Sequence, residues 1–84
     1  MRNQVTEEYI ESKIDRTVFH RIPNTTVTIC TIIMLNGYVV LGDSACVDPA
    51  NFNEVLGEKF AYDKAMSALW ALEGYLLAEE MSEA

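Results

Sequence analysis

The chain has 84 residues, which is enough for one domain and leaves little interior in which to bury side chains. Thirteen acidic residues against six basic ones give a net charge of -7, so the protein should repel duplex nucleic acid and we expect no nucleic-acid binding. No apolar run is as long as a membrane span and the polar first residues do not resemble a signal peptide, so we expect no membrane contact and a cytoplasmic location.

Half of the residues are apolar, which is a high fraction for so short a chain. A domain of this size cannot shelter all of them in its own interior, so we expect copies to cover part of the apolar surface in a homo-oligomer. DNA mimicry is a weaker interpretation of the charge. A mimic needs a surface array of carboxylates, and the middle of this chain is nearly uncharged.

The first predicted element is a helix over residues 6–15. Thr6 is a helix-capping residue, and Glu7 follows it in the first turn, where the helix dipole favours negative charge. Val5 and Ile10 are spaced to pack on each other across the cap. Because so short a helix is marginal in water, we expect it to dock on the rest of the domain.

Residues rich in β-branched and aromatic side chains then predict three antiparallel strands, over 17–22, 25–35 and 38–46. Pro23-Asn24 marks the first turn. Asn36-Gly37 is the strongest available signal for a hairpin, and we expect it to form a two-residue loop that fixes the register.

The predicted register makes both faces of this hairpin apolar near the turn. The pairs on one face are Leu35 with Tyr38, Ile33 with Val40, Thr31 with Gly42, Ile29 with Ser44 and Val27 with Cys46. The pairs on the other face are Met34 with Val39, Ile32 with Leu41, Cys30 with Asp43 and Thr28 with Ala45. We therefore expect the last helix to cover one face and a partner subunit the other.

The last predicted element is a helix that starts at Asp48-Pro49 and runs to about Glu80. Gly57 and Gly74 leave open a kink, or a short helix followed by a long one. Its predicted apolar stripe consists of Val55, Tyr62, Met66, Leu69, Leu76 and Leu77. A neighbouring face carries the small residues Ala61, Ala65 and Ala68, so one face is expected on the sheet and one on a partner.

These elements predict a single α+β domain over residues 1–84, with an N-terminal helix, a three-stranded antiparallel sheet with an Asn-Gly hairpin, and a long C-terminal helix packed on the sheet. The double-stranded RNA-binding domain has the same order of elements. That module works through lysines at the start of its last helix, where this chain has Asp48-Pro49-Ala50-Asn51. We therefore reject RNA binding.

The residues needed for catalysis do not form a known constellation. His20 is the only histidine, and Cys30 and Cys46 lack metal-site spacing and lie on opposite faces in the predicted register. We expect reduced thiols, no metal or cofactor and no enzyme activity. Glu73 lies among apolar residues of the last helix, and we expect a partly buried carboxylate held by a structural ion pair or backbone contact.

Several short motifs occur in one order along the chain. They are Asn36-Gly37-Tyr38, Gly42-Asp43-Ser44-Ala45-Cys46, Pro49-Ala50-Asn51-Phe52, Gly57, Ala61-Tyr62, and Trp70 with Leu72-Glu73-Gly74-Tyr75-Leu76. Together they resemble the small gene-49/gene-66 family of tailed-phage proteins over about residues 22–77. The resemblance implies a phage or prophage origin and an accessory role in the host cell cytoplasm, without an assigned chemistry. Tyr38, where Phe is commoner, Lys64 and Ser67 are mild departures from the family pattern.

Small phage proteins of this class often counter host defence, and some sequester nucleotide second messengers. By that analogy we expect an oligomeric sponge that binds a cyclic nucleotide or a cyclic ADP-ribose-type ligand without hydrolysing it. The side chains suited to bases and phosphates are Tyr38, Phe52, Tyr62, Asn51, Arg16, Arg21 and Lys59. Asp48 competes with phosphate at the helix start, so we expect pockets between subunits. The alternative is a protein-binding inhibitor of a host enzyme that acts through the exposed sheet face or the acidic surface.

Overall fold

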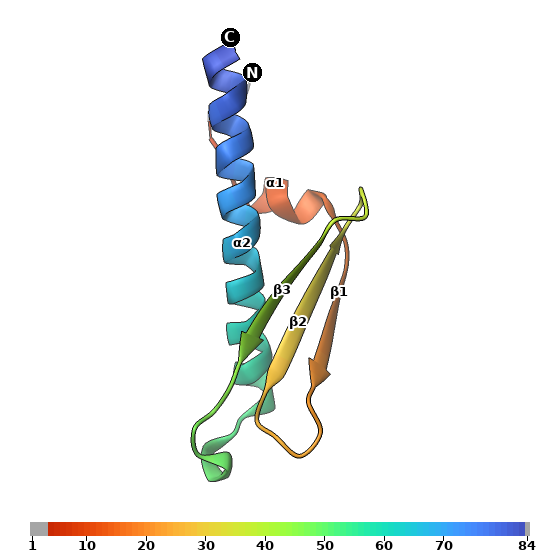
Figure 1. Cartoon of the computed structure of the whole chain (residues 1–84), viewed down its shortest axis with the longest axis vertical. Coiled ribbons are helices and arrows are strands. Elements are labelled where there is room, and N and C mark those ends of the chain that lie inside the picture. The colour runs from red at the N-terminus through yellow and green to blue at the C-terminus, as the bar shows by residue number, and fades with distance from the viewer. Residues whose placement is uncertain (1–3, 84) are drawn as a thin grey trace.

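The computed structural model describes residues 4–83 and has the α+β fold that the sequence predicts. Its elements are helix α1 (Glu7–Ser12), strands β1 (Ile14–Arg21), β2 (Thr28–Met34) and β3 (Val39–Ser44), a 3₁₀ turn (Pro49–Asn51) and helix α2 (Glu54–Glu83). The strands form an antiparallel sheet in the order β1-β2-β3. Helix α2 crosses one face of the sheet, continues well past its end, and meets α1 beside the hairpin turn (Figure 1).

Helix α1 begins where its capping residues predict. The Thr6 hydroxyl oxygen accepts a hydrogen bond of 3.1 Å from the backbone N–H of Tyr9. Ile10 is fully buried and belongs to the central apolar cluster, against which Val5 also packs. This short helix therefore gains its stability from docking rather than from its own length.

The predicted end of α1 at Asp15 is wrong. The backbone N–H of Leu35, at the tip of the hairpin, donates a hydrogen bond of 2.9 Å to the carbonyl oxygen of Lys13. This contact joins the chain to the sheet immediately after α1. Strand β1 therefore begins at Ile14, three residues before the predicted start at Thr17.

The predicted two-residue hairpin loop is also wrong, and the loop has three residues. The Gly37 N–H donates to the Met34 carbonyl at 2.9 Å, and the Met34 N–H donates to the Tyr38 carbonyl at 2.8 Å. Gly37 has a φ of 90°, the left-handed conformation that closes a three-residue loop. The Asn36 side chain stabilises this form, because its Oδ1 accepts from the Tyr38 N–H at 2.9 Å.

The longer loop shifts every predicted pair between β2 and β3 by one residue. The observed pairs are Thr28 with Ser44, Ile29 with Asp43, Cys30 with Gly42, Thr31 with Leu41, Ile32 with Val40 and Ile33 with Val39. Because side chains alternate between faces, the shift exchanges the face of each β3 residue relative to β2.

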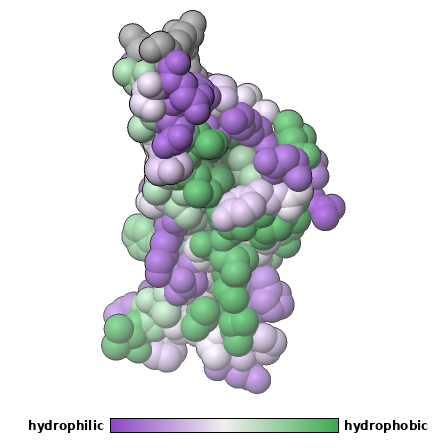
Figure 2. Space-filling view, turned by 45° about the horizontal axis from the view of Figure 1, so that its top comes forward, coloured by the Kyte–Doolittle hydropathy of each residue, from purple (hydrophilic) through white to green (hydrophobic). Residues whose placement is uncertain are grey.

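One face of the sheet packs on α2 and the other is uncovered by the described chain. The buried face carries Thr28, Cys30, Ile32, Met34, Val40 and Gly42. The opposite face, here called the open face, carries Val18, Ile29, Thr31, Ile33, Val39 and Leu41. Leu41 on this face keeps 63% of its surface exposed. The space-filling view shows hydrophobic residues at the surface of the molecule (Figure 2). The expectation that a partner subunit covers the open face stays a prediction.

Helix α2 meets the sheet through its alanines. A Cβ atom on Gly42 would collide with the backbone of Ala61 and Ala65, so β3 and α2 are in backbone contact. Ala61 and Ala65 are completely buried, whereas Val55 of the predicted stripe is 74% exposed. Ala61 and Ala65 therefore belong to the core, together with Met66 and Leu69 of the predicted stripe. The third predicted alanine, Ala68, is exposed, and so are Val55 and Leu76 of the stripe.

The last helical segment is divided into a short and a long part, but the break lies at Phe52 and Asn53 and not at Gly57, which is inside α2. Asp48 caps the short 3₁₀ turn by accepting a 3.0 Å hydrogen bond from the Ala50 N–H. Helix α2 then begins separately at Glu54, where Asn53 Oδ1 accepts from the Leu56 N–H at 3.2 Å. Over residues 4–83, none of the helices has the length and hydropathy that a membrane crossing requires.

Candidate functional site

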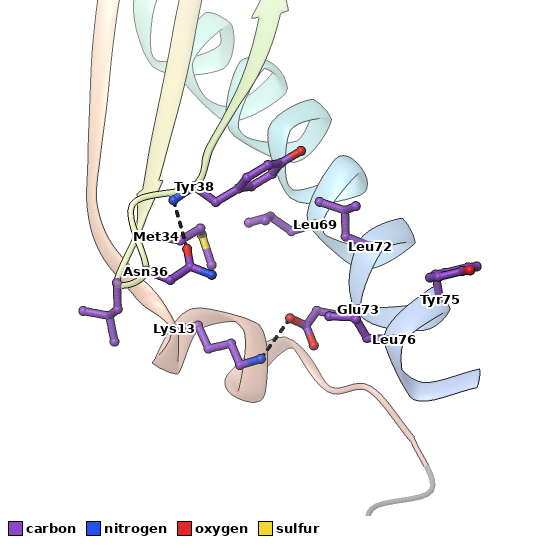
Figure 3. Close-up of a pocket in the computed structure, with 10 residues that line it drawn as sticks. Lys13, Met34, Asn36, Tyr38, Leu69, Leu72, Glu73, Tyr75 and Leu76 are labelled. Carbon is purple, nitrogen blue, oxygen red and sulfur yellow. Dashed lines mark hydrogen bonds and ion pairs between the residues drawn. The ribbon is translucent and has the colours of Figure 1, made fainter. Parts of the chain in front are cut away.

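An apolar groove lies between the hairpin tip and the part of α2 that projects beyond the sheet (Figure 3). Its volume is about 470 Å³. The hairpin contributes Met34, Leu35, Asn36 and Tyr38; helix α2 contributes Leu69, Leu72, Glu73, Tyr75 and Leu76; Lys13 follows α1. We call this hollow the apolar groove.

An ion pair lies in the wall of the apolar groove. Lys13 Nζ is 3.1 Å from Glu73 Oε1, and only 7% of Glu73 is exposed (Figure 3). The Lys13 ammonium also lies 4.6 Å from the centre of the Tyr9 ring. The contact with Tyr9 and the Glu73 carboxylate raise the pKa of Lys13 above its usual 10.5. The predicted structural ion pair at Glu73 is therefore present.

A smaller hollow of about 200 Å³ lies at the other end of the sheet, where β3 leads into α2. It is lined by Thr26, Ser44, Ala45, Cys46, Asn51, Phe52, Asn53, Leu56, Gly57 and Phe60. The Arg21 guanidinium carbon lies 4.1 Å from the centre of the Phe52 ring. We call this the Phe52 hollow. It brings an aromatic ring, a guanidinium group and the Asn51 amide to one place.

The local hydrogen bonds hold most of these groups in position. Arg21 Nε donates to the Thr25 carbonyl at 2.8 Å, which fixes the guanidinium beside the ring. Asn51 Nδ2 donates to Asp48 Oδ2 at 3.3 Å. Asp48 therefore already accepts from the 3₁₀ turn and from Asn51. Its competition with a phosphate at this position stays a prediction.

The seven residues predicted to bind ligand do not form one site within a single copy. Arg21, Asn51 and Phe52 lie together at the Phe52 hollow, and Tyr38 lies in the apolar groove. The remaining three, Arg16, Lys59 and Tyr62, lie elsewhere.

Each of those three has a different environment. Arg16 pairs with Ile33 on the open face, so it lies across the sheet from Arg21. Lys59 is an exposed partner of Asp63, with 2.8 Å between Nζ and Oδ2. Tyr62 packs partly against the central apolar cluster. Because the predicted pockets lie between subunits, the seven-residue site stays a prediction.

Two titratable groups near the core, Tyr62 and Cys30, have raised pKa values. Burial, followed by the nearby carboxylates of Glu11 and Glu7, raises the pKa of Tyr62. Burial also raises the pKa of the Cys30 thiol, which faces α2. His20 lies on the open face, so it is separated from this thiol by the sheet. Among the described residues, no three His, Cys, Asp or Glu side chains gather as a metal site would require.

The apolar groove was not predicted, although the sequence contains a signal for it. A helix of 30 residues is about 45 Å long, whereas a strand of seven residues spans only about 23 Å. A helix packed on such a sheet must project beyond it. The apolar residues Leu72, Tyr75 and Leu76 occur in the projecting part, where the sheet cannot cover them.

The model of the Phage protein (N4 Gp49/phage Sf6 gene 66) family matches residues 5–81, which is nearly the whole chain. No curated protein and no solved structure matches the chain.

Proposed function

The chain belongs to the phage protein (N4 Gp49/phage Sf6 gene 66) family, and on this premise we propose that it is an accessory counter-defence protein that sequesters a nucleotide second messenger. It binds the messenger as an oligomer and releases it intact. Sequestration requires affinity and abundance but no reactive group, which agrees with the scattered positions of His20, Cys30 and Cys46.

The observation that carries this proposal is the stacking of Arg21 on Phe52 beside the Phe52 hollow. A nucleotide messenger presents a flat base, a hydrogen-bonding edge and phosphates. Phe52 offers an aromatic face, Asn51 an amide, and Arg21 a guanidinium group, which binds phosphate well.

The size of the Phe52 hollow supports an oligomeric site. Its volume of about 200 Å³ lies below the roughly 300–1,000 Å³ of ordinary ligand pockets. One copy therefore supplies part of a site, and a second copy supplies the rest. The open face, with Val18, Val39 and Leu41 about half exposed or more, is turned away from this hollow, so we expect it to be a second surface through which copies meet.

Ligand binding is tested by thermal unfolding in the presence of cyclic oligonucleotides and cyclic ADP-ribose isomers. A true ligand raises the unfolding temperature, and it is recovered chemically unchanged after the protein is denatured by heat. Arg21→Ala should weaken that ligand by at least about tenfold, because a charge-assisted contact is lost. Lys64→Ala is the matched control, since it removes an equal charge from a surface pair with Asp43.

Binding to a host defence enzyme is the second candidate function, and the apolar open face favours it. The two functions separate in cells that carry a defence system and express the protein. Inhibition through the open face predicts that the Leu41→Asp protein no longer protects an infecting phage from the defence system, whereas the Arg21→Ala protein still does. The sponge predicts that Arg21→Ala abolishes protection. A ligand panel without any thermal shift would leave the inhibitor as the better proposal.

A further inference from the structure

The open face has an apolar centre and charged corners. Cross-strand pairing divides it into three rows, each with one residue from β1, one from β2 and one from β3. From the hairpin end, the rows are Arg16, Ile33 and Val39; then Val18, Thr31 and Leu41; then His20, Ile29 and Asp43. An apolar centre with a polar border is the usual composition of a surface through which proteins associate.

The two outer strands carry different charges on the open face. Strand β1 contributes Arg16 and His20, neither of which forms an ion pair with another residue between 4 and 83. Strand β3 contributes Asp43, the one acid in the three rows. Its Oδ1 contacts Lys64 Nζ at 3.1 Å, but the Asp43 side chain is still 60% exposed, so the carboxylate can accept from a further cation. The open face therefore has a basic edge and an acidic edge.

The net charge of -7 opposes association between copies of this chain. Helix α2 alone carries seven acids and two lysines. In the three rows of the open face, by contrast, the charges of Arg16 and Asp43 cancel. Two copies that meet through their open faces keep both α2 helices on the outer sides, because α2 packs on the opposite face of each sheet (Figure 1). The open face therefore allows copies to meet without bringing their acidic helices together.

We propose that the open face is covered by the open face of a second copy, with β1 of each copy opposite β3 of the other. A two-fold axis that runs along β2, between the two sheets, produces this arrangement. It places Val18 over the partner's Leu41, and it places Asp43 over the partner's β1, where Arg16 and His20 lie. A two-fold axis across the strands would instead bring Arg16 over the partner's His20. The charges therefore select the first arrangement, and burial of the apolar rows stabilises it.

Pairing through the open face has consequences for both candidate functions. The Phe52 hollow includes Ser44 and Gly57, which meet between β3 and α2, so it lies on the outer side of each paired copy. Contacts with further copies can then complete the hollow. The same pairing occupies the surface through which a host enzyme would be inhibited, so a stable pair favours the sponge over the inhibitor. The pairing itself does not depend on nucleotide binding.

The test exchanges the charges of the two edges in the full chain. A copy with Arg16→Glu and His20→Glu has acids on both edges, and a copy with Asp43→Lys has basic residues on both. Each variant alone should dissociate to a smaller species, with a dissociation constant at least about tenfold that of the natural chain. An equimolar mixture should associate again, because each acidic edge then faces a basic one. Sedimentation velocity of each variant and of the mixture measures this.

Three control variants separate pairing from charge and from folding. Lys59→Glu and Glu79→Lys change the charge of exposed positions on α2 in the same two directions, and they should leave association unchanged. Asp43→Lys also removes the ion pair with Lys64, so Lys64→Ala, which removes only that ion pair, should leave association unchanged as well. Urea unfolding of every variant establishes that it is folded.

Cross-linking with a short bismaleimide tests the orientation of the two copies, in chains that also carry Cys46→Ser. A mixture of Val18→Cys and Leu41→Cys chains should cross-link, and each alone should cross-link much less. The proposal is overturned if the charge-exchanged variants associate as the natural chain does, if their mixture stays dissociated, or if Val18→Cys alone cross-links as readily as the mixture. Loss of the nucleotide response affects none of these readouts, so the two proposals fail separately.

Discussion

Helix α2 packs on the sheet along its first half and projects beyond the sheet along its second half (Figure 1). In the first half, Ala61 and Ala65 are buried in backbone contact with Gly42 of β3. In the second half, from Trp70 onwards, five large apolar residues are at least 40% exposed, namely Trp70, Leu72, Tyr75, Leu76 and Met81, whereas Leu77 is buried. The first half fixes the fold and allows few substitutions. The second half carries apolar surface that the single chain does not use, so we infer that it serves binding.

The largest effect is expected at the closest contact of the packed half. Gly42→Val places a side chain against the backbone of Ala61 and Ala65, which cannot move as a flexible side chain would. We expect a loss of about 3 kcal/mol or more in the free energy of unfolding, because the helix must move away from the sheet. Urea unfolding measures the change. A stability equal to that of the natural chain would show that α2 does not contact β3 in this way.

The next comparison uses two leucines three residues apart. Leu69 is 3% exposed and Leu72 is 41% exposed, so they lie on the two sides of the boundary between the buried and the exposed surface of α2. Leu69→Ala should lower the free energy of unfolding by about 3 kcal/mol, because it leaves a cavity. Leu72→Ala should change it by no more than about 0.5 kcal/mol, as at other exposed sites. Equal losses from the two variants would contradict the proposed boundary.

A smaller and opposite effect is expected in the uncovered half. Gly74 has open space around the position of a Cβ atom, and it lies within the helix. Gly74→Ala should therefore raise the free energy of unfolding by roughly 0.5–1 kcal/mol, since alanine loses less backbone entropy there. Thermal and urea unfolding both test this. A clear destabilisation would mean that another surface closely approaches this glycine.

The smallest expected effect on the free energy of unfolding at neutral pH comes from two titratable groups near the core, Cys30 and Tyr62. The pKa values of the Cys30 thiol and the Tyr62 phenol are raised by burial, from ordinary values of 9.0 and 10.0. The folded protein therefore retains protons that the unfolded chain releases, so stability is intact below about pH 9 and declines as the pH rises through the folded values. Unfolding measured between about pH 8 and pH 11 should show the decline, less steeply in Tyr62→Phe. A rise in stability over this range would contradict the assigned burial.

Much of this fold was predictable because the signals are local. Thr6 caps α1, Asp48 caps the 3₁₀ turn, and Asn36-Gly37 forms the hairpin at the expected place. The register was wrong because Asn-Gly suits both a two-residue loop and a three-residue loop with left-handed Gly37. The choice between them depends on the contacts of the sheet, including the Leu35 hydrogen bond to Lys13.

The division of α2 was harder to predict. Helical spacing places Leu76 and Leu69 on one stripe, but only the length of the sheet decides which of them is covered. The alanines bury little area themselves, so their role becomes clear only through Gly42 on another strand. Of the predicted ligand residues, Asn51 and Phe52 are adjacent in sequence. The approach of Arg21 to Phe52 depends on the tertiary fold.

The most direct test of the whole account is sedimentation equilibrium of the natural chain over micromolar concentrations. The account predicts an oligomer that Leu41→Asp, a change on the open face, converts to a smaller folded species. A well-folded single copy of the natural chain at these concentrations would contradict it, because the uncovered apolar surface would then have no role in association between copies.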